Sequence, residues 1–295
     1  MNSKKIINSS MLLLASIIWG FAFVAQKEGL NALGPFMINA LRSFLAGIVL
    51  LPLISILDKK APTPTIKGTR KDLFLGSIFC GTALFLASSF QQFGLIGTDA
   101  GKSGFITAMY IIIVPIFAMV LGRKTTIKTW ISVFIAVVGM YLLCVKDNFT
   151  IEVSDLLVLC CAALFSVHIL VIDHFSPRVN GVKLSCMQFF VTGLLSLIAS
   201  FIVGESTSLE SIFAAKYSIL YLGVLSSGAG YTLQIVAQNG LNPTLASMIM
   251  SLESVFALLA GTLFGEQISL RGGIGCLVMF IAVILAQLPE KKKCA

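Results

Sequence analysis

The sequence predicts an all-α membrane protein with ten transmembrane helices, arranged as two inverted repeats of five helices each, with both termini in the cytoplasm. Three observations predict this fold class: a strongly apolar composition, a series of long uncharged segments, and a weak match between the two halves of the chain. Of the 295 residues, 57% are hydrophobic and 12% are charged, and the mean hydropathy is +0.96. A soluble domain could not hide that much apolar surface from water.

The uncharged segments set the number of helices, because a helix needs roughly 20 apolar residues to cross the hydrocarbon core. They cover residues 6–26, 43–57, 73–98, 103–122, 129–145, 156–172, 184–204, 217–252 and 272–289. The segment 217–252 is too long for one helix, and the helix-breaking run from Asn239 to Pro243 divides it into two. The segment 43–57 is too short, so we extend it back to Pro35 and accept Arg42 inside the helix. The total is ten.

The positions of the basic residues predict the orientation, since cytoplasmic loops are enriched in Lys and Arg. With ten helices and a cytoplasmic N-terminus, the inside loops hold Lys4, Lys5, Lys59, Lys60, Lys67, Arg70, Lys71, Arg123, Lys124, Lys128, Arg178, Lys183, Lys291, Lys292 and Lys293. The outside loops hold only Lys27, Lys102, Lys146, Lys216 and Arg271. The net charge of +8 is therefore interpreted as membrane topology, and we expect no nucleic-acid partner.

A weak internal repeat relates the two halves at a shift of 146 to 147 residues. Leu75-Gly76 aligns with Leu222-Gly223, and Thr98-x-Ala100 aligns with Thr244-x-Ala246. After a slip of three residues, Leu121-Gly122-Arg123 aligns with Phe264-Gly265-Glu266. The predicted units are residues 1–147 and 148–295, with no soluble domain. Five helices per unit is an odd number, so the second unit must enter the membrane from the opposite side, an architecture typical of secondary transporters.

The chain resembles the drug/metabolite transporter superfamily, and in particular its ten-helix EamA-type members. The resemblance rests on short motifs in matching order: Trp19-Gly20-x-x-Phe23, Arg42-x-Phe44-x-Ala46, Gly101-Lys102-Ser103-Gly104-Phe105-Ile106-Thr107, Pro115-x-Phe117, Leu252-Glu253-x-Val255-Phe256 and Gly265-Glu266. It covers essentially the whole chain. One departure is Arg123-Lys124, where many relatives carry Gly-Glu.

The resemblance implies a multi-pass plasma (inner) membrane carrier that moves small polar organic solutes by alternating access and exports amino acids or related metabolites. Metabolite uptake and multidrug efflux are the alternatives within transport. An intramembrane enzyme or a sensor is a remote alternative from a different class.

Polar side chains near the predicted midplane are the candidate site residues, because a charge at a helix centre costs about 2.5–3.5 kcal/mol on insertion scales. The candidates for substrate binding or coupling in a central cavity are Trp19, Arg42, Thr107, Tyr110, His168, Tyr231, Gln234 and Glu253. Glu253 has three interpretations: a protonatable coupling group, a counter-charge for a substrate ammonium, or a neutral residue hydrogen-bonded to a neighbouring helix. Arg42 either binds a substrate carboxylate, pairs with Glu253, or is a structural or snorkelling residue at the cavity mouth.

The remaining candidates keep two interpretations each. His168 either relays protons, since its pKa is ordinarily near physiological pH, or packs as a satisfied core residue. Trp19 and Tyr231 either stack on a substrate or fill space between helices. A glutamine cluster at the ends of two repeat-related helices either lines the cavity mouths or joins helices by hydrogen bonds; it comprises Gln91, Gln92, Gln234 and Gln238 with Asn239.

The stretch GTDAGKSG, residues 97–104, superficially suggests a nucleotide-binding loop. A P-loop requires G-x-x-x-x-G-K-[ST] after a strand, whereas Ile96 occupies the first glycine position and a membrane helix precedes the stretch. Thr98 or Asp99 is instead predicted to cap a helix, as Asn242 does ahead of Pro243. The sequence also lacks HExxH and GxSxG motifs. We therefore expect no nucleotide, metal or other cofactor and no catalytic residues.

Overall fold

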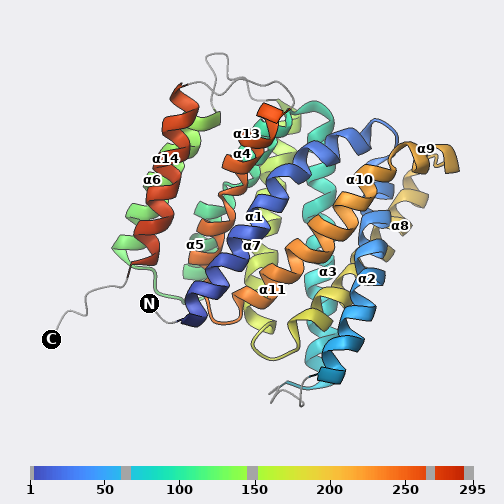
Figure 1. Cartoon of the computed structure of the whole chain (residues 1–295), viewed down its shortest axis with the longest axis horizontal. Helices are drawn as coiled ribbons and strands as arrows, with labels where there is room; N and C mark the ends of the chain where they lie inside the picture. Colours follow the sequence, from blue (N-terminus) through green and yellow to red (C-terminus); the bar gives the residue numbers. More distant parts are fainter. Residues whose placement is uncertain (1–2, 61–67, 145–151, 264–269, 289–295) are drawn as a thin grey trace.

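A computed structural model describes residues 3–60, 68–144, 152–263 and 270–288 of the chain. All regular elements in these ranges are helices (Figure 1). The helices before residue 145 are α1 (Ser3–Leu30), α2 (Pro35–Lys60), α3 (Arg70–Gly97), α4 (Ala100–Thr107), α5 (Tyr110–Val120) and α6 (Ile127–Cys144). Those after residue 152 are α7 (Val153–Phe175), α8 (Gly181–Val203), α9 (Leu209–Ala214), α10 (Lys216–Leu220), η1 (Tyr221–Tyr231), α11 (Thr232–Gln238), α12 (Pro243–Met250), α13 (Glu253–Leu263) and α14 (Leu270–Gln287).

Nine helical segments of the described chain are long and apolar enough to cross a membrane. Three of them join consecutive elements: α4 with α5, α10 with η1 and α11, and α12 with α13. A further apolar helix, Ile127–Leu142 within α6, is shorter. The predicted start at Pro35 and the predicted break between Gln238 and Pro243 are both confirmed.

Capping residues account for several helix starts. The side chain of Thr69 accepts a hydrogen bond from the amide of Asp72, whose carboxylate accepts one in return, which forms a capping box at α3. Asn242 caps α12 by accepting from the amide of Thr244 at 2.9 Å, as predicted. Asp99 occupies the capping position of α4 but makes no side-chain cap, because its carboxylate pairs with Lys27 at 3.3 Å.

Side chains are distributed as expected for a protein in lipid. Large apolar residues face outward, and Phe134 and Ile202 are 70% and 79% exposed. Serine, asparagine and glutamine side chains are buried between helices instead. Such an apolar exterior would be unfavourable in water, and together with the long apolar helices it shows a multi-pass membrane protein.

Helix packing depends on a few close contacts. The main pairs are α3 with α7 and α8, α2 with α8, α1 with α13, and α6 with α14, which stand side by side at the left of Figure 1. At Gly20, an added Cβ would lie 2.5 Å from the Cβ of Phe256, so α1 approaches α13 closely. The hydroxyl of Thr192 donates to the carbonyl of Gly81 at 2.9 Å and ties α8 to α3.

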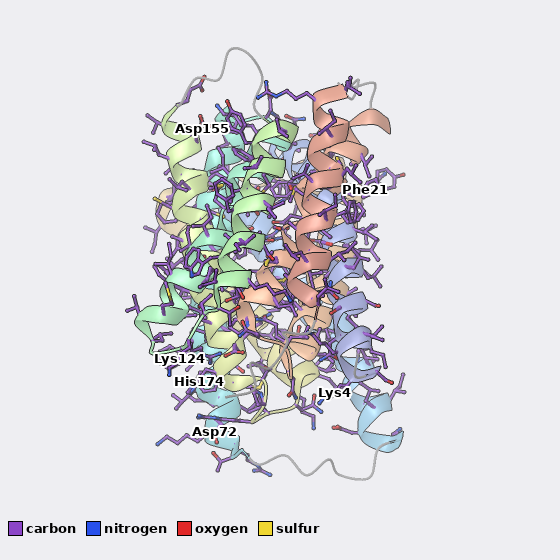
Figure 2. The ribbon with its side chains drawn as sticks, turned by 90° about the vertical axis from the view of Figure 1, so that its left-hand side faces the viewer. Lys4, Phe21, Asp72, Lys124, Asp155 and His174 are labelled. Carbon is purple, nitrogen blue, oxygen red and sulfur yellow. The ribbon has the colours of Figure 1, made fainter. Side chains whose placement is uncertain are left out.

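The bundle has two distinct ends. Lys4, Asp72, Lys124 and His174 lie toward one end and Asp155 toward the other (Figure 2). We call the first the basic end, defined by Lys4, Lys5, Lys124 and Lys128; the second, the opposite end, is defined by Asp99, Lys102 and Asp155. At the basic end the ammonium of Lys5 donates to the carbonyl of Gln287 at 3.4 Å. The start of α1 and the end of α14 therefore lie at the same end of the bundle.

Some features predicted from sequence lie outside the described residues. They are Lys67, Lys146, the run Lys291 to Lys293, the Gly265-Glu266 motif and the boundary between units at 147–148.

Candidate functional site

A polar cavity lies inside the bundle where α1, α2, α3, α7, η1 and α11 meet the interrupted helices α4–α5 and α12–α13. Seven of the eight predicted site residues line it: Trp19, Arg42, Thr107, Tyr110, Tyr231, Gln234 and Glu253. Its volume is about 40 Å³, enough for about three water molecules at roughly 10–15 Å³ each. A solute of more than a few atoms therefore requires the surrounding side chains or helices to move.

Two helix interruptions meet at this cavity. α4 ends at Thr107 and α5 begins at Tyr110, while α12 ends at Met250 and α13 begins at Glu253. The hydroxyl of Tyr110 donates to Oε1 of Glu253 at 3.0 Å. The two starting residues are 143 apart, the spacing that also relates Leu121-Gly122-Arg123 to Phe264-Gly265-Glu266. Both half-helices thus place a polar side chain at the centre of the bundle.

Local hydrogen bonds from serine side chains accompany the interruption of the second helix. The hydroxyls of Ser247, Ser251 and Ser254 each donate to the carbonyl three residues earlier at 2.8 Å. Such back-bonding bends helices. The backbone hydrogen bonding also changes at this point, because the amide of Leu252 donates to the carbonyl of Ile249, three residues earlier, at 3.2 Å. A short stretch of i to i+3 bonds inside a helix is typical of a hinge.

Arg42 is buried, with 4% of its surface exposed. Its Nη1 donates to Oε1 of Gln26 at 3.2 Å, and Nε2 of Gln92 donates to the same oxygen at 3.0 Å. The guanidinium is thus positioned by a neutral amide contributed by α1. The expectation that Arg42 snorkels to the surface is wrong, because its side chain is enclosed and lines the cavity.

Arg42 and Glu253 place a guanidinium and a carboxyl group in one cavity, yet among the described residues no ion pair joins them. Glu253 is 5% exposed. A buried charge is stable only when it is paired, hydrogen-bonded or neutralised by a proton. The cavity therefore offers a guanidinium and a carboxyl group to whatever enters it.

Aromatic rings form one wall. The rings of Trp19 and Tyr231 lie 4.8 Å apart between centroids, and Nε1 of Trp19 donates to the carbonyl of Ser226 at 3.1 Å. Gly230 makes room for the indole, since an added Cβ would lie 2.7 Å from Nε1. Ser226, Gly230 and Tyr231 all belong to η1, an 11-residue π-helix, and π-helical segments are frequent at functional sites.

His168 does not line the cavity and lies behind its aromatic wall. Its ring contacts Tyr231 at 5.9 Å and Phe165 at 6.4 Å between centroids, and Nε2 is 3.2 Å from Oε1 of Gln188. The residue is fully buried, and among the described atoms its Nδ1 has no hydrogen-bond partner. His168 thus contacts the site only through Tyr231 and Phe165.

The predicted glutamine cluster divides into two groups. Gln91 and Gln234 line the cavity, and Nε2 of Gln91 donates to the hydroxyl of Thr107 at 3.3 Å. Within the described chain Oε1 of Gln234 has no partner, so it is a further acceptor at the cavity. Gln92 and Gln238 instead join helices: Gln92 reaches Gln26, and Gln238 donates to the carbonyl of Ile169 at 3.2 Å.

One polar lining residue, Gln26, was not among the residues predicted from sequence. Gln26 follows Trp19 by seven residues, which places both on one face of a helix, so periodicity could have identified it. Ser226 takes part through its carbonyl oxygen, which no side-chain pattern reveals.

Interrupted helices around a central polar cavity define a class, the polytopic carriers that bind solutes between two halves of a helical bundle. The model of the EamA-like transporter family matches residues 7–145 and 153–288 of this chain. The chain belongs to this family, within the drug/metabolite transporter superfamily, as its sequence motifs predict.

Relatives agree with this assignment. An uncharacterized transporter of Archaeoglobus fulgidus is 30% identical over 279 residues, covering 94% of this chain and 84% of the relative. The uncharacterized transporter YoaV of Bacillus subtilis is 23% identical over 93% of this chain and 94% of its own. The uncharacterized inner membrane transporter YedA of Escherichia coli is 23% identical over 92% of this chain and 88% of its own. A crystal structure with 16% identity has a TM-score of 0.76 over 95% of this chain and 96% of its own, a likeness of fold alone. These names indicate a transporter rather than an enzyme.

Proposed function

We propose that this protein is a secondary transporter of small zwitterionic solutes, above all amino acids, and that it works by alternating access. The observation that carries the proposal is a pair of buried ionisable residues, Arg42 and Glu253, which line one cavity and, among the described residues, form no ion pair with each other. In this arrangement Arg42 binds the carboxylate of the substrate and Glu253 binds its ammonium.

The energetics favour a substrate with both charges. Each charge at the centre of a membrane helix costs about 2.5–3.5 kcal/mol on insertion scales, and a zwitterion would offset both costs at once. Oε1 of Gln234 adds an acceptor for the ammonium. The rings of Trp19 and Tyr231, which are tilted by 54° to each other, add aromatic faces, which attract cations.

The proposed architecture is ten crossings in two inverted five-helix repeats, residues 1–147 and 148–295. The contacts between helices support it, because equivalent helices of the two halves make equivalent contacts. α1 packs against α12–α13 as α7 packs against α4–α5. Likewise, α3 packs against α7 as η1 and α11 pack against α1. An even number of crossings is supported by the contact between Lys5 in α1 and Gln287 at the end of α14. Counting α6 with the nine longer segments gives ten.

The proposed sidedness places the basic end, and with it both termini, in the cytoplasm. Export is the direction implied by the family resemblance, and the inner membrane is the proposed location because the Escherichia coli relative is named an inner membrane transporter. Coupling to protons would use Glu253, since its carboxylate binds either a proton or the substrate ammonium.

The test is a flux screen in proteoliposomes with labelled amino acids, nucleosides and cationic drugs, with and without a pH gradient. We expect amino acid transport, and we expect Glu253→Gln to reduce it at least tenfold and to abolish its dependence on the gradient. Glu28→Gln, at an exposed position of the same chain, is the matched control and should be unchanged.

Other outcomes separate the alternatives. Transport of cationic drugs that requires Glu253 but not Arg42 would indicate a multidrug carrier. Transport only in the inward direction would indicate metabolite uptake. If no solute moved under any gradient, the proposal would fail.

A further inference from the structure

A second polar cavity lies at the basic end, separate from the central one. It has a volume of about 270 Å³ and lies between the starts of α1, α6 and α12, the α5–α6 turn and the end of α14. Lys5, Lys124 and Lys128 line it, and no aspartate or glutamate is among its described lining residues. Three hydroxyl-bearing residues of the turn and of α6, Thr125, Thr126 and Thr129, complete its polar wall.

Among the described residues, no carboxylate forms an ion pair with the lysines of this cavity. Lys5 donates to the carbonyl of Gln287 at 3.4 Å, and Lys128 donates to the carbonyl of Leu288. Both acceptors are neutral. The ion pairs formed within the described chain involve Lys27, Lys102, Arg123 and Lys183, and none involves a lysine of this cavity.

A hydroxyl-bearing residue of α12 also lines this cavity. Thr244 lies in the first turn of α12, is 4% exposed and lines the cavity. Its amide is used by the cap Asn242, but the hydrogen bonds between described residues leave its hydroxyl without a partner. The first turn of a helix carries partial positive charge and favours anions.

The opposite end shows what such a threonine does when an anion is present. Thr98 is related to Thr244 by the shift of 146 residues, and its hydroxyl donates to Oδ1 of Asp155 at 3.1 Å. Lys102 pairs with Oδ2 of the same carboxylate at 2.6 Å. The same shift relates Asp155 to Ser9, which is neutral. α4 packs against α7 as α12 packs against α1. At the basic cavity, threonine and lysines are thus present, and the described lining residues include no carboxylate.

We propose that this basic cavity binds a phosphate group. Three ammonium groups, a free hydroxyl and a helix N-terminus suit a compact anion with several oxygens. The site lies where phospholipid headgroups of the cytoplasmic leaflet would be found, and basic pockets between membrane helices on that side are typical headgroup sites. The phosphate belongs either to an anionic lipid or to a soluble phosphate compound. Bound there, it ties the α6–α14 pair to α1 and α12.

The experiment measures ligand binding to the purified full-length protein in a neutral detergent. The probes are dioctanoylphosphatidylglycerol, dioctanoylphosphatidylcholine and inorganic phosphate, and the readouts are native mass spectrometry and the shift in melting temperature. We expect phosphatidylglycerol or inorganic phosphate to bind and to raise the melting temperature, more strongly at low ionic strength. Binding of phosphatidylglycerol alone identifies a lipid headgroup, and an equal response to inorganic phosphate identifies a soluble anion.

Variants locate the binding. The triple variant Lys5→Gln, Lys124→Gln, Lys128→Gln should bind at least tenfold more weakly. A control triple with equal loss of charge at the same end, Lys59→Gln, Arg70→Gln, Lys71→Gln, should bind like the wild type. The milder Thr244→Val should weaken binding about threefold even if the triple variant folds poorly. Equal binding by all four proteins, an equal response to phosphatidylcholine, or no response to any probe would overturn the proposal.

Discussion

Glu253 shows how a single residue can be positioned for function by its neighbours. It begins α13, next to the interruption after Met250, and its carboxylate accepts a hydrogen bond from Tyr110 at the start of α5. The hydrogen bond required by the interpretation of Glu253 as a neutral residue bonded to a neighbouring helix is present, but the neutral state itself stays a prediction. That contact leaves its second carboxylate oxygen for a substrate or a proton, so the functional interpretation stays a prediction.

Removal of the Tyr110 hydroxyl tests this contact. Hydrogen bonds to charged groups contribute about 1.5–3 kcal/mol, so Tyr110→Phe should weaken substrate binding roughly tenfold while keeping the ring in place. The measurement is the KM for transport in proteoliposomes. Tyr217→Phe makes the same chemical change at a residue that is 76% exposed and should leave KM unchanged. An unchanged KM in Tyr110→Phe would show that the hydroxyl does not prepare Glu253 for binding.

At the scale of the element, the sequence predicted where helices lie better than how they are shaped. Pro35 and the Asn239-to-Pro243 turn carry local signals that the structure follows. The interruption at Ala108 and Met109 contains neither glycine nor proline, and η1 is π-helical although nothing in its composition requires it. Both depend on contacts with other helices, such as the hydrogen bond from Trp19 to Ser226, which a single helix does not specify.

Close packing of α1 on α13 gives a prediction at this scale. In Gly20→Ala, the new Cβ would lie 2.5 Å from the Cβ of Phe256 and 2.7 Å from the amide nitrogen of Ala257, so one helix must shift. Overpacking of this kind costs about 1–3 kcal/mol. The melting temperature of the purified protein should fall.

Gly101→Ala and Gly273→Ala are the controls, because an added Cβ there meets nothing within 4 Å. They should leave the melting temperature unchanged or slightly higher, since alanine is the better helix former. A decrease equal to that of Gly20→Ala would show that loss of glycine, rather than the contact with α13, is responsible.

For the whole molecule, composition predicted the membrane class and short motifs predicted the family, and seven of the eight candidate residues lie on one cavity. Midplane depth was a good guide because carriers place polar groups there. Depth alone did not distinguish His168, which lies at a similar level but behind Tyr231. Depth did not identify Gln26 because it lies farther from the predicted midplane, although it shares a helix face with Trp19.

Sidedness is the prediction that belongs to the whole molecule. Asn31 lies in the exposed turn between α1 and α2, and Lys71 is exposed at the start of α3. In a cysteine-free background, a membrane-impermeant thiol reagent applied to intact cells should label Asn31→Cys but not Lys71→Cys. After the membrane is opened, both should react. Labelling of Lys71→Cys from outside would contradict cytoplasmic termini.

The central claim is that Arg42 and Glu253 bind opposite ends of one zwitterion. The most direct measurement is transport in proteoliposomes of an amino acid, its methyl ester and its N-acetyl derivative, by the wild type, Arg42→Gln and Glu253→Gln. The wild type should prefer the amino acid to both derivatives; Arg42→Gln should lose only its preference over the ester, and Glu253→Gln only its preference over the N-acetyl compound. If both variants kept the preferences of the wild type, the two charges would not be the substrate's partners.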